Sequence, residues 1–165
     1  MSHPLTYPPP RYLGDTGEVS ATLRRAEHEP ELTHASGGGA HYLATSASTG
    51  GEFGLYRWDM GAIPSGPSAH FHTSISESFF VLSGTVRLYD GERWADGSPG
   101  DFLYVPQGGI HAFRNESGEP ASMLLLFTPG APREDYFETL ARQGLQGMTE
   151  QQQADFFLRH DTFWT

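Results

Sequence analysis

Two histidines and a carboxylate lie close together near the middle of the chain. His70 and His72 are two residues apart, so in a strand both side chains point to the same face. Glu77 follows five residues later, after a Thr-Ser-Ile-Ser segment that favours a turn or bulge able to change the side-chain facing. Imidazoles with a carboxylate are ligands for first-row metals. The spacing therefore indicates a metal site, with half-exposed strand histidines as the alternative interpretation.

A third imidazole is available from His111, which follows the apolar run 102–105 and a Gly-Gly loop. Three imidazoles and one carboxylate suit Fe, Mn, Ni, Co, Cu or Zn. The chain has no cysteine, which excludes both thiolate ligands and disulfides. The sequence therefore predicts one divalent transition metal ion per chain, of open identity. Its predicted ligands are His70, His72, Glu77 and His111.

Residues 70–84 and 100–115 together resemble the two signature motifs of the cupin superfamily. The positions that match the first motif are His70, His72, Glu77 and Gly84. The positions that match the second are Gly100, Pro106, Gly108, His111 and Asn115. One departure is Pro64, which stands where the first motif usually opens with glycine, and it bears on the local turn rather than on the ligands. The surroundings of the motifs resemble bacterial quercetin 2,3-dioxygenase-like monocupins.

The resemblance implies a fold, a reaction and a catalytic residue. The fold is an all-β cupin jelly-roll barrel, and the reaction is the dioxygenase-type opening of an enolisable, flavonol-like aromatic substrate by dioxygen. Glu77 takes the place of the catalytic glutamate that removes the substrate hydroxyl proton. Two alternatives stay open, because one fold hosts many activities. One is a non-oxidative metal-dependent lyase, isomerase or polyketide cyclase, and the other is a small-molecule-binding cupin without turnover.

The strands and helices that must position these residues are predicted from the spacing of turns along the 165-residue chain. Short apolar stretches separated by Gly- and Pro-rich turns indicate an all-β barrel or sandwich. We expect residues 1–40 to form an N-terminal arm and loop, with a short strand near 19–23. Residues 41–130 are expected to form the cupin barrel. Residues 131–165 are expected to add two short helices on its outside, the second opening with a capping box at Thr149.

Aromatic residues on the predicted strands provide candidates for a substrate pocket. In the stretch 53–60, the face that carries an aromatic pair and a methionine is the more apolar one, so it is expected to point inward. The predicted pocket residues are Tyr56, Trp58, Met60, Phe79, Tyr104 and Phe113. Ordinary core packing is the alternative for each of them. A pocket of this kind favours a hydrophobic or aromatic small molecule.

The overall composition narrows the class of protein. With 20 acidic and 10 basic residues, the formal net charge is −10, which argues against binding to nucleic acid or anionic membranes. No run approaches the ~20 apolar residues of a spanning helix, and Met1–Pro4 shows no secretory signal. A cytoplasmic protein is therefore expected. The arm and the terminal aromatic pair Phe163 and Trp164 suggest surfaces for a homodimer.

Overall fold

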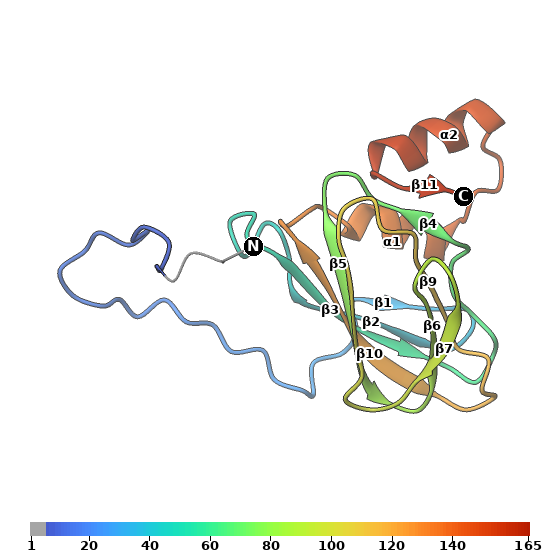
Figure 1. Cartoon of the computed structure of the whole chain (residues 1–165), viewed down its shortest axis with the longest axis horizontal. Helices are drawn as coiled ribbons and strands as arrows, with labels where there is room; N and C mark the ends of the chain where they lie inside the picture. Colours follow the sequence, from blue (N-terminus) through green and yellow to red (C-terminus); the bar gives the residue numbers. More distant parts are fainter. Residues whose placement is uncertain (1–5) are drawn as a thin grey trace.

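The computed structural model describes residues 6–165 and arranges most of the strands in two facing sheets (Figure 1). The larger sheet has the strand order β1-β2-β3-β10-β5-β8, and a smaller sheet has the order β7-β6-β9. Strands β4 and β11 pair with each other, and a bridge between His70 and His111 connects β4 to the β9 side. The expectation about a secretory signal concerns Met1–Pro4, which lies outside the described residues.

The bounds of the strands agree with the predicted turn spacing. The larger sheet consists of β1 (Leu32–Thr33), β2 (Gly38–Ala44), β3 (Gly54–Met60), β5 (Ser76–Ser83), β8 (Phe102–Val105) and β10 (Ala121–Thr128). The remaining strands are β4 (His70–Phe71), β6 (Val86–Tyr89), β7 (Trp94–Gly97), β9 (Ala112–Arg114) and β11 (Phe163–Trp164). All strand pairs are antiparallel.

The arrangement is a jelly roll, as the all-β prediction requires. Within residues 6–165 the ladders leave β1 and β8 as edges of the larger sheet, so the sheets are not closed into one continuous barrel. Side chains that point inward at every second strand position fill the space between the sheets. Along β10 the burial alternates, and Met123, Leu125 and Phe127 point inward at 0–1% exposure. On β3, Tyr56 and Met60 are buried on the face predicted to look inward.

The core is expected to depend strongly on Phe79, which lies on β5 with no exposed surface. Phe79→Ala is expected to lower the free energy of unfolding by about 3–5 kcal/mol, because it leaves a cavity between the sheets. Phe102→Ala on β8 is the matched control, since that side chain is 62% exposed. It is expected to change stability by less than about 0.5 kcal/mol. Urea unfolding measures both, and equal losses in the two variants would contradict the assignment of the core.

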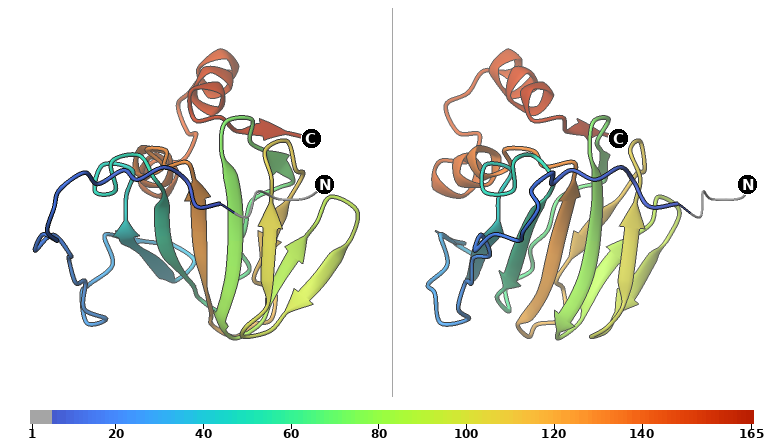
Figure 2. Two further views of the ribbon diagram at one scale, coloured as in Figure 1. Left: turned by 60° about the vertical axis from the view of Figure 1, so that its left-hand side comes forward. Right: turned by 90° about the vertical axis from the view of Figure 1, so that its left-hand side faces the viewer.

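Two helices follow the last long strand. Helix α1 spans Glu134–Arg142, and α2 spans Glu150–Arg159 with the predicted Thr149–Gln152 capping box in place. Phe137 of α1 is buried, and its ring centroid lies 5.3 Å and 5.0 Å from those of the β3 residues Tyr56 and Trp58. Both helices lie at the same end of the sandwich (Figure 2). Because Phe137 reaches inward-facing residues of β3, α1 covers an open end of the jelly roll rather than its outer face.

The N-terminal arm lies outside the sandwich (Figure 1). Residues 6–30 form neither helix nor strand, and the strand expected near 19–23 is absent. Val19 is fully exposed there, because no strand among residues 6–165 pairs with the segment. Arg11 forms an ion pair with Glu52. No helix among residues 6–165 has the length and apolar character needed to cross a membrane. The division into an arm, a barrel and a helical extension stays a prediction.

Candidate metal centre

Backbone pairing places two of the predicted ligands side by side. The His70 N–H donates to the His111 carbonyl at 3.0 Å, and the His111 N–H donates to the His70 carbonyl at 2.9 Å. This reciprocal pair is the hydrogen-bonded type of antiparallel pairing, so the two side chains share one face. Their ring centroids are 4.4 Å apart. His72 lies two residues further on, on the same face, and its carbonyl accepts from the Gly108 N–H at 2.7 Å.

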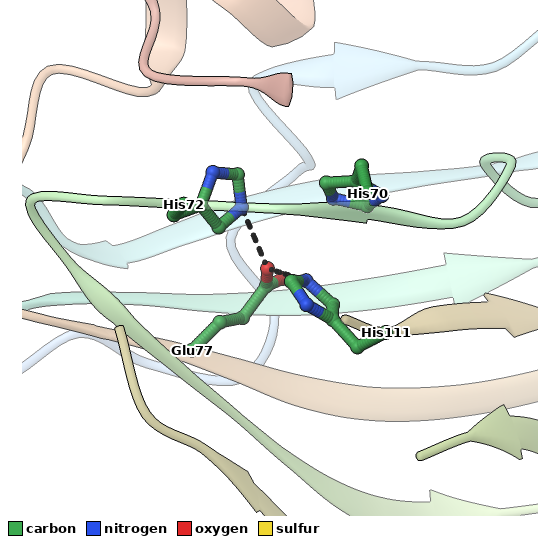
Figure 3. Close-up of side chains that lie close together, drawn as sticks. All are labelled: His70, His72, Glu77 and His111. Atoms are coloured by element: carbon green, nitrogen blue, oxygen red, sulfur yellow. Dashed lines mark hydrogen bonds and ion pairs between the residues drawn. The ribbon is translucent and has the colours of Figure 1, made fainter. Parts of the chain in front are cut away.

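Glu77 approaches the three imidazoles from the opposite sheet. It lies on β5, and the short segment 73–75 leads the chain across the sandwich from β4. The alternation of side chains along β4 therefore does not determine the direction in which Glu77 points. Its Oε2 is 3.1 Å from His72 Nε2 and 2.8 Å from His111 Nε2 (Figure 3). One ligand atom from each of the four residues lies within 4.8 Å of the others. All four residues are at least 94% buried, so these groups converge away from bulk water.

The three imidazole rings share one orientation, because each directs Nδ1 at a backbone carbonyl. The three contacts are His70 to Ser68 at 2.9 Å, His72 to Asp161 at 2.6 Å and His111 to Gly109 at 2.9 Å. A carbonyl oxygen only accepts hydrogen bonds, so Nδ1 carries the proton in each ring. A ring that is otherwise unprotonated then presents its Nε2 lone pair to the cluster, as metal binding requires. Metal-binding histidines are commonly fixed by such an outer hydrogen bond.

The electrostatics of the cluster call for a cation. Burial lowers the pKa of His70 to about 4, which favours its neutral form. Burial alone would raise the pKa of Glu77, but hydrogen bonds and charge interactions with His111 and His72 lower it below the usual range, so the carboxylate is ionised. Burial also acts to lower the pKa of His111, but Glu77 outweighs it and raises the value. The ionised carboxylate needs positive charge beside it, which imidazole protons or a divalent metal ion supply, and three imidazoles with one carboxylate fit such a metal.

Asp161 supports this cluster from the segment after α2. Its backbone carbonyl accepts from His72, and its carboxylate accepts from the N–H groups of Thr73 at 3.0 Å and Ser74 at 2.8 Å. Asp161 has a φ of 51°, a left-handed conformation that aspartate tolerates better than most residues. The C-terminal segment thus fixes both the ring of His72 and the turn that leads to Glu77.

Replacing Asp161 with alanine is expected to weaken metal binding about 10-fold to 100-fold, because the turn that leads to Glu77 loses the carboxylate that accepts from Thr73 and Ser74. The backbone carbonyl that orients His72 stays in place. Competition with a chromophoric chelator measures the affinity. Asp155→Ala is the control, since Asp155 is exposed on α2 and does not contact the cluster. Equal affinity of the Asp161 variant and the unmodified protein would show that the Asp161 carboxylate has no part in positioning the site.

A cavity of about 560 Å³ opens on the cluster, with His70 and Glu77 in its wall. Of the six predicted pocket residues, Trp58, Met60 and Phe113 line it. Tyr56 and Phe79 are fully buried in the core and do not line the cavity. The placement of Tyr104 in a pocket is wrong. Its neighbour Val105 is buried on the inner face, so Tyr104 points outward and is 57% exposed.

Sequence reasoning missed the residues that close the cavity from outside the sandwich. Helix α1 contributes an apolar side, α2 contributes Phe157, and the terminal strand contributes Trp164, whose ring centroid is 5.3 Å from that of His70. His34 also lines the cavity, with its ring 4.5 Å from that of Trp58, and Arg133 stands beside α1. The apolar stripe of α1 was visible in the sequence, but no local signal indicates which surface a helix will cover.

Comparisons with known proteins agree with this geometry. Residues 58–127 match the family Cupin_2, described as a cupin domain. A quercetin 2,3-dioxygenase from Bacillus subtilis is 34% identical over 71 residues, which cover 43% of this chain and 20% of that protein. The match thus spans only a fifth of the length of that relative.

Solved structures of low identity share the fold. KdgF from Halomonas sp. has a TM-score of 0.58 at 16% identity, covering 70% of this chain and 99% of that chain. A predicted oxalate decarboxylase from Thermotoga maritima has a TM-score of 0.55 at 18% identity, covering 65% and 97%. The jelly roll, the family match and the buried His/Glu cluster together lead to one conclusion. The chain contains a cupin domain suited to a metal ion, and it resembles bacterial quercetin 2,3-dioxygenase-like cupins.

Proposed function

We propose that the protein is a metal-dependent dioxygenase of the quercetin 2,3-dioxygenase-like type, which opens an enolisable aromatic substrate. The observation that carries this proposal is the convergence of three imidazole nitrogens and one carboxylate at the wall of a mostly apolar cavity. A divalent metal held by His70, His72, Glu77 and His111 would supply Lewis acidity toward a substrate oxygen and, if redox-active, reactivity toward dioxygen.

Glu77 is the residue proposed to move a proton. Its lowered pKa keeps it ionised, so it can accept the proton of a substrate hydroxyl and leave an enolate in the cavity. An ionised carboxylate bound by cationic partners is a weak base. When its oxygen turns from the cluster toward the substrate, the burial that by itself raises its pKa makes Glu77 a stronger base.

The walls of the cavity suit a planar, largely apolar substrate. Trp58 and Phe113 face the cavity from the sheets, and Phe137 faces it from α1. The volume of about 560 Å³ lies within the range of small-molecule sites. Aromatic side chains at these positions exclude water from the reacting group and hold an aromatic ring by edge or face contacts.

Oxygen uptake tests the proposal. The protein is loaded separately with Fe, Mn, Ni, Co, Cu or Zn and mixed with a panel of flavonols in an oxygen electrode. Flavonol-dependent oxygen loss with a redox-active metal is expected, together with loss of flavonol absorbance. Conversion of a substrate without oxygen loss would replace the dioxygenase with a non-oxidative lyase, isomerase or cyclase. The homodimer and the cytoplasmic location stay predictions, and light scattering in solution tests the first.

A further inference from the structure

Arg133 is a buried cation beside the metal centre. It stands at the position just before α1, lines the same cavity as His70 and Glu77, and has only 4% of its surface exposed. Its Nη1 donates to the His160 carbonyl at 2.7 Å, whereas its Nε has no hydrogen-bond partner. Among residues 6–165 no carboxylate lies within ion-pair distance of this guanidinium. A helix N-terminus, with its positive end of the dipole, is also an unfavourable place for a cation.

The surroundings of the guanidinium are aromatic rather than anionic. Its central carbon lies 4.2 Å from the ring centroid of Tyr136, 5.3 Å from that of Phe127 and 5.5 Å from that of Phe137. Cation–π contacts offset part of the cost of burying the charge. They do not supply a counter-charge, and a buried cation without one is strongly disfavoured.

The two carboxylates whose charges act on Arg133, those of Glu77 and Asp161, already have other hydrogen-bond partners. Burial lowers the pKa of Arg133, and the charges of Glu77 and, more weakly, Asp161 act to raise it. The carboxylate of Glu77 faces His72 and His111, and that of Asp161 accepts from Thr73 and Ser74. A divalent metal bound at the cluster would neutralise the negative charge of Glu77. The cavity would then hold an excess of positive charge next to apolar walls, which is an environment for an anionic ligand.

We propose that Arg133 binds the carboxylate of the substrate, and that the cavity therefore takes aromatic acids in preference to neutral aromatic compounds. The planar guanidinium and a planar carboxylate are well matched, and one acidic group suits a cavity whose other walls are mainly apolar. The inference rests on the proposed function in one respect, that this cavity is the substrate site. It narrows the substrate to an enolisable aromatic compound that carries an acid.

A purely structural role for Arg133 is the competing explanation. Its hydrogen bond to His160 ties the start of α1 to the end of α2, and this link alone would explain why the residue is buried. Structural support affects every ligand of the cavity alike. Recognition of an anion affects only charged ligands, so a pair of probes with the same shape and different charge separates the two roles.

Binding of cinnamate and of its neutral amide, cinnamamide, is measured by calorimetry on zinc-loaded protein. The unmodified protein is expected to prefer cinnamate. In Arg133→Met the affinity for cinnamate is expected to fall about 10-fold to 100-fold, as for a lost charged hydrogen bond, while that for cinnamamide stays within about twofold. Arg142→Met is the matched control on α1, because that side chain is 71% exposed. It is expected to leave both affinities unchanged.

An equal loss for both probes, or no loss for either, would overturn the proposal in favour of a structural role. If Arg133→Met does not fold, a crystal structure of the unmodified protein with cinnamate decides. A carboxylate oxygen within hydrogen-bond distance of the guanidinium is expected, and a carboxylate directed elsewhere would overturn the proposal. Both tests measure binding, so absence of oxygen uptake would overturn the dioxygenase proposal and leave this one standing.

Discussion

Replacing His111 with alanine is expected to reduce bound metal from about one equivalent per chain to near zero. His111 is 1% exposed and lies 2.8 Å from Glu77, so its loss removes a ligand from the centre of the cluster and lets water into the gap. His72→Ala is expected to act in the same way from the other side of Glu77. Elemental analysis after reconstitution and desalting measures the metal content.

His41→Ala is the matched control for these variants. His41 is also buried, at 7% exposed, but its Nε2 contacts Asp59 at 3.1 Å, outside the cluster. It is expected to keep full metal content. Circular dichroism separates loss of ligand from loss of fold in each variant. A folded His111→Ala protein that still binds metal with unchanged stoichiometry and affinity would show that the metal is held somewhere else.

Glu77→Gln is expected to lower turnover about 10²-fold to 10⁴-fold, even at metal concentrations that fill the site. Glutamine keeps the size of the side chain and can offer one oxygen, but it has no negative charge and cannot take the proton of a substrate hydroxyl. The variant is also expected to bind metal more weakly, since the charge that balances the cation is gone. Oxygen uptake is therefore measured against metal concentration up to saturation.

Glu119→Gln, at an exposed position, is the control for a change of charge alone and is expected to have unchanged turnover. Turnover measured at saturating metal concentration separates the role of Glu77 in proton transfer from its role as a metal ligand. If the Glu77 variant regains normal turnover once its metal site is full, Glu77 is a ligand only, and another group or water removes the substrate proton.

The arrangement of the four candidate metal ligands was partly predictable from the sequence, because it depends in part on local regularities. The two-residue spacing of His70 and His72 puts both on one strand face. The second motif supplies His111, which pairs with His70 through backbone hydrogen bonds. The position of Glu77 in the facing sheet was not accessible. It depends on where segment 73–75 leads the chain, and that is determined by packing of distant strands and by Asp161.

The cavity was only partly predictable for the same reason. Strand alternation identified Trp58 and Met60, since both lie on the more apolar face of β3. The expectation for Tyr104 failed because an apolar strand carries large residues on both faces, and only Val105 points inward there. The roles of His34 and Arg133 depend on contacts between segments far apart in sequence. The capping box at Thr149 predicted a helix, but a cap contains no information about the surface on which the helix packs.

Elemental analysis of the protein purified without chelators tests the central claim most directly. A metal-dependent cupin is expected to contain about one equivalent of a transition metal per chain, which His111→Ala loses. Protein that contains no metal, and takes up none when Fe, Mn, Ni, Co, Cu and Zn are offered in turn, would contradict the claim. The buried cluster would then be a charge network of the core, and the cavity would belong to a binding protein.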